Sequence, residues 1–182
     1  MLLSVDDGCA SDLRLADLCD KYEIDCVFYW PVEWHSLAYD NGYEPLSYDD
    51  ALEIARRYEI GSHTVTHRHL TKLTLEEAQY EIVASKFMLE RLFKKDVTKF
   101  AAPRGYTSDE LSELTLDFYS SQRLTKGKGL VHVHPNSGAN GNKPWVECID
   151  EYTTELWMHS WELNKYDLWD ELEEVLSAYT HS

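Results

Sequence analysis

Two adjacent carboxylates, Asp6 and Asp7, end the first apolar run of the sequence and are followed by Gly8. A strand suited to burial gains nothing from two like charges at its end, because each loses hydration and repels the other. A divalent cation offsets that repulsion. The pattern therefore indicates that one aspartate binds a metal ion while the other accepts a proton from water.

Two histidines, His63 and His67, follow a later short apolar run within the sequence HTVTH. If residues 63–67 are helical, the two imidazoles lie one above the other and reach a single ion. With one aspartate they form a set that leaves a position open for water, as in catalytic zinc sites. Thr64 and Val65 occupy the place where metalloproteases carry glutamate, so the aspartate pair must supply the base.

Short apolar runs alternate with amphipathic stretches along most of the chain, a pattern typical of an α/β fold with a mostly parallel sheet. We predict one domain over residues 1–182, with Asp6, Asp7, His63, His67 and His159 meeting where strands end. The predicted strands cover residues 2–5, 25–32, 58–61, 98–102, 130–135 and 154–161, and the predicted helices 15–22, 47–57, 74–93, 109–114 and 169–179, with loops after residue 32 and over 125–144.

The charge balance argues against some partners. Seventeen basic and 33 acidic side chains leave a net charge of -16, which repels nucleic acid and anionic membrane surfaces. No apolar stretch approaches the roughly 20 residues that span a bilayer, so we expect a soluble protein. Because no leader precedes the first strand, we expect it in the cytoplasm, with export left open if residues precede this sequence. The cysteines lack metal-site spacing and are expected in the core: Cys9, Cys19, Cys26 and Cys148.

Four segments, in order, resemble the motifs of the polysaccharide deacetylase family, or NodB-homology domain: SVDDG, HTVTH, FAAPRGY and LWMHSW. The resemblance implies a distorted, incomplete (β/α) barrel and removal of acetyl groups from N-acetylated oligo- or polysaccharides. It implies that Asp6 is the general base and His159 the general acid. It also implies that Asp7, His63 and His67 hold one divalent metal, usually Zn²⁺, with Co²⁺, Ni²⁺ or Mn²⁺ as alternatives.

Two motifs depart from the family pattern. Ala101 stands where the family carries an arginine that buttresses the catalytic aspartate, so either Arg104 reaches Asp6 or no arginine does. The backbone N–H of Arg104 is expected in the oxyanion hole. The fourth motif is matched at best by Asp117, which leaves the residue that orients His159 unidentified.

Aromatic side chains near the predicted strand ends are candidates for stacking on sugar rings, with core packing as the alternative for each tryptophan. Trp161 is the first choice, because it follows His159 by two residues; Trp34, Trp145 and Tyr106 are further candidates. Three histidines are expected on the surface or in loops: His69, His132 and His134.

Two other functions fit these residues. One is a related hydrolase that cleaves another non-peptide C–N bond in a small amide, since the motifs define a metal and a base but no sugar. The other is a metal-containing carbohydrate-binding protein that has lost turnover, which Ala101 would permit. The oligomeric state stays open.

Overall fold

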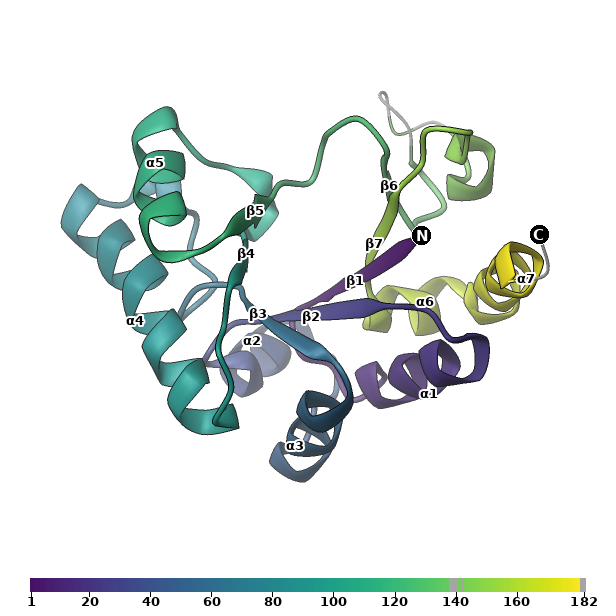
Figure 1. Cartoon of the computed structure of the whole chain (residues 1–182), viewed down its shortest axis with the longest axis horizontal. Helices are drawn as coiled ribbons and strands as arrows, with labels where there is room; N and C mark the ends of the chain where they lie inside the picture. Colours follow the sequence, from purple (N-terminus) through teal and green to yellow (C-terminus); the bar gives the residue numbers. More distant parts are fainter. Residues whose placement is uncertain (138–140, 142, 181–182) are drawn as a thin grey trace.

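The computed structural model describes residues 1–137, 141 and 143–180, and its centre is one curved sheet (Figure 1). Within these residues seven strands pair in the order β5-β4-β3-β2-β1-β7-β6, and every pair is parallel. The strands are β1 (Leu2–Asp6), β2 (Cys26–Trp30), β3 (Glu59–Ser62), β4 (Lys99–Ala101), β5 (Ser121–Arg123), β6 (Leu130–His132) and β7 (Glu155–His159).

Helices follow most strands and lie around the outer side of the sheet, while β5 and β6 form its two edges (Figure 1). Because these edges do not pair with each other, the barrel is open on one side, which confirms the predicted incomplete (β/α) barrel. The helices are α1 (Asp12–Tyr22), α2 (Trp34–Asn41), α3 (Tyr48–Arg57), α4 (Leu75–Phe93), α5 (Asp109–Phe118), α6 (Ser160–Tyr166) and α7 (Trp169–Thr180), with short 3₁₀ turns at Leu70–Lys72, Pro103–Gly105 and Trp145–Cys148.

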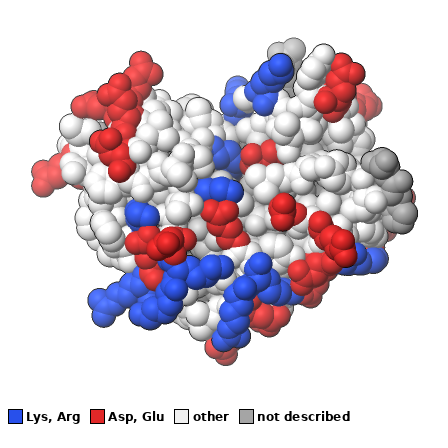
Figure 2. Space-filling model, in the orientation of Figure 1, with Lys and Arg blue, Asp and Glu red and all other residues white. Residues whose placement is uncertain are grey.

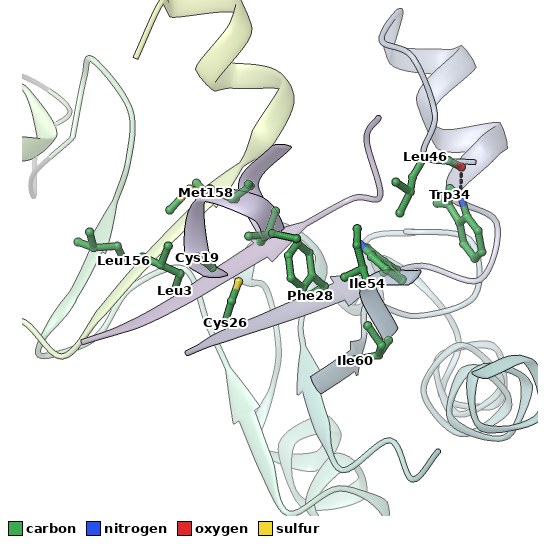
Figure 3. Packing of buried hydrophobic residues seen from close by; sticks show 14 of the residues in the cluster. Leu3, Cys19, Cys26, Phe28, Trp34, Leu46, Ile54, Ile60, Leu156 and Met158 are labelled. Carbon is green, nitrogen blue, oxygen red and sulfur yellow. Dashed lines mark hydrogen bonds between the residues drawn. The ribbon is translucent and has the colours of Figure 1, made fainter. Parts of the chain in front are cut away.

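The two faces of the sheet differ in polarity. Successive side chains of a strand point to opposite faces, so in β1 Leu3 and Val5 face the helices and belong to the main core, whereas Ser4 and Asp6 face the barrel interior. The outer face packs on the helices through apolar side chains of β1, β2, β3 and β7 (Figure 3). An apolar layer thus lies between the sheet and the helices, and the other face of the sheet carries polar groups that can meet in the barrel interior.

Local signals explain the well-predicted helices. Thr74 and Glu77 form a capping box at the start of α4, and Ser47 accepts a hydrogen bond from the Asp50 N–H at the start of α3. Such caps satisfy N–H groups that a helix leaves without partners and stabilise it by about 1 kcal/mol each. Helices α2 and α6 and the short strand β5 were not expected from the sequence, and β7 ends at His159 rather than at residue 161.

The remaining bulk predictions can be compared with the structure. All four cysteines are free, with Cys9, Cys19 and Cys26 buried and Cys148 half-buried, as expected for core residues. No helix in the described ranges is long and apolar enough to cross a bilayer. On the face that Figure 2 shows, acidic and basic side chains lie intermixed rather than in one extended basic surface.

Candidate functional site

Strand register brings the predicted residues to one end of the barrel. Asp6, the last residue of β1, is paired with His159, the last residue of β7. On the other side of β1, β2 pairs with β3 so that Trp30 lies beside Ser62, and His63 follows directly. Parallel strands end at the same edge of a sheet, so Asp6, Asp7, His63, His67 and His159 converge although 153 positions separate the first from the last.

A tight turn presents Asp7 to this cluster. Asp7 and Gly8 both have left-handed backbones, with φ of 82° and 74°. A Cβ on Gly8 would lie 2.8 Å from the Cβ of Trp34, so the turn has no room for a larger residue. The turn therefore requires glycine at position 8, and Asp7, which follows the strand-ending Asp6, turns its carboxylate toward the histidines.

Asp7, His63 and His67 have the chemistry and spacing of a metal site. Asp7 Oδ1 lies 3.4 Å from His67 Nε2 and 3.7 Å from His63 Nε2. Ligand atoms around a tetrahedral Zn²⁺, with bonds of about 2.0–2.1 Å, are roughly 3.3–3.4 Å apart. Asp7 Oδ1 is also buried and makes no hydrogen bond within the described part of the chain. A buried carboxylate oxygen without a donor fits a cation, so these residues fit a divalent metal ion.

Residues 63–67 are not helical, so the condition under which helical spacing would bring His63 and His67 together is not met. Thr64 and His67 have left-handed backbones, with φ of 74° and 60°, which no helix contains. The segment is a loop, and the buried Glu81 of α4 holds it by accepting hydrogen bonds of 2.9 Å from the N–H groups of Val65 and Thr66. The two imidazoles approach each other, with ring centres 4.8 Å apart, because of this loop rather than because of helical spacing.

The two imidazoles are neutral and suitably oriented. Burial lowers the pKa of His63 and of His67 to about 4, although nearby aspartates oppose the change. His63 Nδ1 lies 2.8 Å from the carbonyl oxygen of Ala101 and donates to it, which directs the lone pair of Nε2 toward Asp7. Neutral imidazole with one fixed N–H is the form that binds metal.

Arg123 is the cationic partner of Asp6. Its guanidinium donates to both carboxylate oxygens of Asp6, at 2.5 Å for Oδ2. The guanidinium carbon also lies 5.0 Å and 5.3 Å from the ring centres of Tyr29 and Trp157, between which it is held. Burial alone would raise the pKa of Asp6, but Arg123 and the neighbouring imidazoles outweigh it and hold the pKa below its ordinary value. Asp6 is thus ionised and fixed in place.

The expectation that Arg104 or nothing would reach Asp6 is wrong. Arg104 is exposed on the turn after β4, whereas Arg123 comes from β5, a strand that the sequence analysis did not predict. Arg123 is the register partner of Ala101, the position at which an arginine was missing. The only sequence signal was a lone arginine at the end of SQR, 22 residues after Ala101, and a cross-strand pairing cannot be inferred from that spacing.

Glu162, not Asp117, orients His159. His159 Nδ1 lies 2.9 Å from Glu162 Oε2, in the first turn of α6, and His159 Nε2 lies 3.6 Å from Asp7 Oδ2. Burial opposes the charged form of His159, but Asp7 and Glu162 raise its pKa to about 9. Asp117 is exposed on α5. The spacing of the residues in HSWE was the signal for Glu162, because i and i+3 lie on one side of a helical turn.

The aromatic candidates divide into core and site residues. Trp34 is fully buried and donates to the Leu46 carbonyl oxygen at 2.8 Å (Figure 3), and Trp145 is also fully buried, so neither is placed to stack on a sugar. Trp161 lies 5.7 Å from His159, ring centre to ring centre, and its indole N–H is buried without a partner among the described residues. Tyr106 is exposed and stacks on His69 at 4.4 Å.

A cavity of about 670 Å³ lies along the segment from Thr125 to His132, where the barrel is not closed, and its lining does not include the five clustered residues. Arg104, Thr125 and Lys126 line one part of it, and Trp157 of β7 lines another. Its volume is typical of a small-molecule site. His132, expected on the surface or in a loop, is instead the last residue of β6, whereas His134 lies in the loop after it as expected; their rings stack with centres 5.1 Å apart.

Comparisons with known proteins bear on the family and the fold of the chain. The family model for polysaccharide deacetylase matches residues 1–118, more than half of the chain. No curated protein matches the sequence.

Several solved structures share the fold. A CE4 family pseudoenzyme from Bacillus anthracis is 17% identical with a TM-score of 0.70, over 98% of this chain and 61% of that protein; a mutant of it with restored enzymatic activity has a TM-score of 0.72 at 19% identity, over 98% and 63%. This chain thus spans less than two thirds of that protein. The peptidoglycan deacetylase PdaC from Bacillus subtilis is 16% identical with a TM-score of 0.67, over 100% of this chain and 83% of PdaC. With this fold and the family-model match, the chain belongs to the polysaccharide deacetylase family.

Proposed function

We propose that this protein is a metal-dependent hydrolase that removes acetyl groups from N-acetylated sugars. The observation that carries the proposal is the arrangement of the two aspartates: Asp7 has a buried oxygen without a donor beside two neutral imidazoles, and Asp6 is ionised and fixed by Arg123. One carboxylate is thus available to a metal and the other to a proton. Family membership and the similarity to peptidoglycan deacetylases support the choice of an N-acetylated sugar as substrate.

Asp7, His63 and His67 would hold the metal ion, with Zn²⁺ as the first choice for a donor set of two nitrogens and one carboxylate. Such an ion supplies polarisation of an amide carbonyl and a lowered pKa for water. Two of these ligands are buried, since His63 is 1% exposed and Asp7 6%.

Asp6 and His159 would move the protons. Asp6 takes the proton of the attacking water, and its carboxylate is ready to do so because Arg123 keeps it charged. His159, whose Nε2 lies 3.6 Å from Asp7 Oδ2, is placed to give a proton to the departing amine. Glu162 stabilises the imidazolium form and fixes which nitrogen faces Asp7. The base and the acid of this proposal thus come from register partners at the ends of neighbouring strands.

The turn after β4 and the open side of the barrel would receive the substrate. Arg104 has a left-handed backbone, with φ of 59°, and none of the described backbone carbonyls accepts its N–H. That N–H is our candidate donor to the developing oxyanion. The cavity lined by Arg104 and Trp157 is our candidate site for a sugar ring. Trp161, which lines a different cavity, and Tyr106 are further candidate stacking surfaces.

The experiment compares acetate release from chitooligosaccharides by metal-free protein, by protein with one equivalent of Zn²⁺, and by Asp6→Asn with Zn²⁺. We expect release only from the zinc-loaded wild type, with a loss of about 10²–10⁴-fold for Asp6→Asn because the base is removed. Equal, negligible release by both zinc-loaded proteins, with substrate still bound, would favour the carbohydrate-binding alternative. A panel of small N-acetyl amides tests the other hydrolase alternative in the same assay.

A further inference from the structure

A second group of metal-binding side chains lies behind His159. His159 Nδ1 and His132 Nε2 lie 2.9 Å and 3.1 Å from the same oxygen, Glu162 Oε2, and His134 Nε2 lies 3.8 Å from Glu162 Oε1. His132, His159 and Glu162 each offer a ligand atom, and these atoms lie within 4.8 Å of one another. Three imidazoles therefore lie around one carboxylate, although Glu162 needs to contact only His159 in order to orient it.

The fold holds these groups together. His132 is the register partner of Trp157 across β6 and β7, and its ring stacks on the indole at 3.8 Å. Val133 N–H continues the pairing by donating to the Trp157 carbonyl oxygen at 2.9 Å. Alternate residues of a strand share a face, so His134 lies on the side of His132, and His159 on the side of Trp157. The site is thus built from two paired strands and the helical turn that carries Glu162.

The donor set is that of a transition metal. Imidazole nitrogens with one carboxylate oxygen suit Zn²⁺, Co²⁺, Ni²⁺ and Cu²⁺. The separations of 2.9 Å and 3.1 Å need to widen by only a few tenths of an ångström to match the roughly 3.3 Å between ligands of tetrahedral zinc. The side chains are accessible to an ion from solvent, because those of His132, His134 and His159 are 24%, 18% and 20% exposed.

We propose that His132, His159 and Glu162, with His134 as the nearby fourth ligand, form a second Zn²⁺ site, and that zinc bound there inhibits the enzyme. His159 is shared: its Nε2 faces Asp7, at 3.6 Å, while its Nδ1 faces Glu162. An ion on Nδ1 takes the place of a proton, so the ring is no longer an imidazolium that can protonate an amine. The inhibition rests on the proposed function, whereas the second binding event does not.

The test titrates metal-free protein, without a polyhistidine tag, with Zn²⁺ alone in a calorimeter and follows metal content after gel filtration. We expect two equivalents for wild type, and one each for His132→Phe and for His67→Phe. The first change keeps a ring against Trp157, and the second removes a ligand of the other site. His35→Phe, in α2, is the matched control and should bind two equivalents. Circular dichroism checks that each variant is folded.

The same proteins then give acetate-release rates across zinc concentrations, each relative to its own rate at one equivalent. The acetate-release rate of wild type and of His35→Phe should fall at least about tenfold at excess zinc. The rate of His132→Phe should fall less than twofold. The second site would be overturned if wild type bound only one equivalent of Zn²⁺, or if His132→Phe still bound two. Two equivalents without inhibition would overturn the shared role of His159. If no protein releases acetate, the proposed function fails while the titration still decides the second site.

Discussion

The pairing of Asp6 with Arg123 makes a quantitative prediction about stability. Their side chains are only 3% and 6% exposed, so removing either partner leaves a buried charge without compensation. Such a loss costs about 3–5 kcal/mol, whereas an exposed pair contributes about 0.2–1 kcal/mol. We expect Arg123→Met to lower the free energy of unfolding by about 5 kcal/mol. Asp6→Asn should lower it by about 3 kcal/mol, because Arg123 Nε still has Glu155 at 3.8 Å.

The assay is a double-mutant cycle by urea unfolding at pH 7 in EDTA, which prevents metal from stabilising Asp6. The double variant Asp6→Asn/Arg123→Met should be less destabilised than the two single losses added together, with a coupling energy of at least about 2 kcal/mol. The comparison requires that all variants show the same dependence of the free energy of unfolding on urea concentration. The matched control is the pair Lys99 and Glu59, 2.8 Å apart with side chains 30% and 37% exposed, for which the coupling should stay below about 1 kcal/mol.

Additive single effects at Asp6 and Arg123 would refute the reasoning, because they would mean that the buried pair is not a unit. Activity offers an independent readout. Arg123→Met should lower kcat/KM by about 10²–10³-fold as Asp6 loses its charge. Adding Ala101→Arg to that variant places a guanidinium at the neighbouring strand position and should recover at least about tenfold.

Three further predictions follow from single contacts. Asp12 is buried, and burial raises its pKa to about 7 from 3.8. The folded state therefore holds the proton of Asp12 more tightly than the unfolded state does. In urea titrations with EDTA, the free energy of unfolding of wild type should fall relative to that of Asp12→Asn as pH rises from about 4 to 7, by up to about 4 kcal/mol. It should not change further above pH 7. Gly8→Ala should cost about 2–4 kcal/mol by thermal unfolding, because its Cβ would meet Trp34, while Gly42→Ala, with φ of 75° and nothing within 4 Å, should cost about 1 kcal/mol; equal losses would contradict the packing argument. Glu81→Gln should weaken Zn²⁺ binding by about 10–100-fold in a chelator competition, since Glu81 holds the loop that carries His63 and His67, and unchanged affinity would show that the loop needs no such anchor.

Much of the architecture could be read from the sequence because it depends on local patterns. The alternation of apolar runs and amphipathic stretches predicted the parallel sheet, and the caps at Ser47 and Thr74 predicted where two helices begin. Clustering of residues at strand ends follows from parallel topology alone. Hence the meeting of Asp6 with His63 and His159 could be predicted without coordinates.

Two of the parts that failed depend on geometry that no local pattern carries. Arg123 belongs to a short polar strand, and its approach to Asp6 requires the register of β4 with β5. The loop that carries His63 and His67 depends on positive φ at Thr64 and His67, a conformation that is uncommon for residues other than glycine. The two histidines do lie close together, but a loop and not helical spacing brings them there.

Anomalous diffraction at the zinc edge, from crystals of the protein loaded with one equivalent of Zn²⁺, tests the central claim most directly. We predict a peak about 2.0–2.2 Å from one carboxylate oxygen of Asp7 and from Nε2 of His63 and His67, with Asp6 bonded to Arg123 and not to the ion. A peak bound to Asp6 instead of Asp7, or no peak at these histidines, would contradict the account.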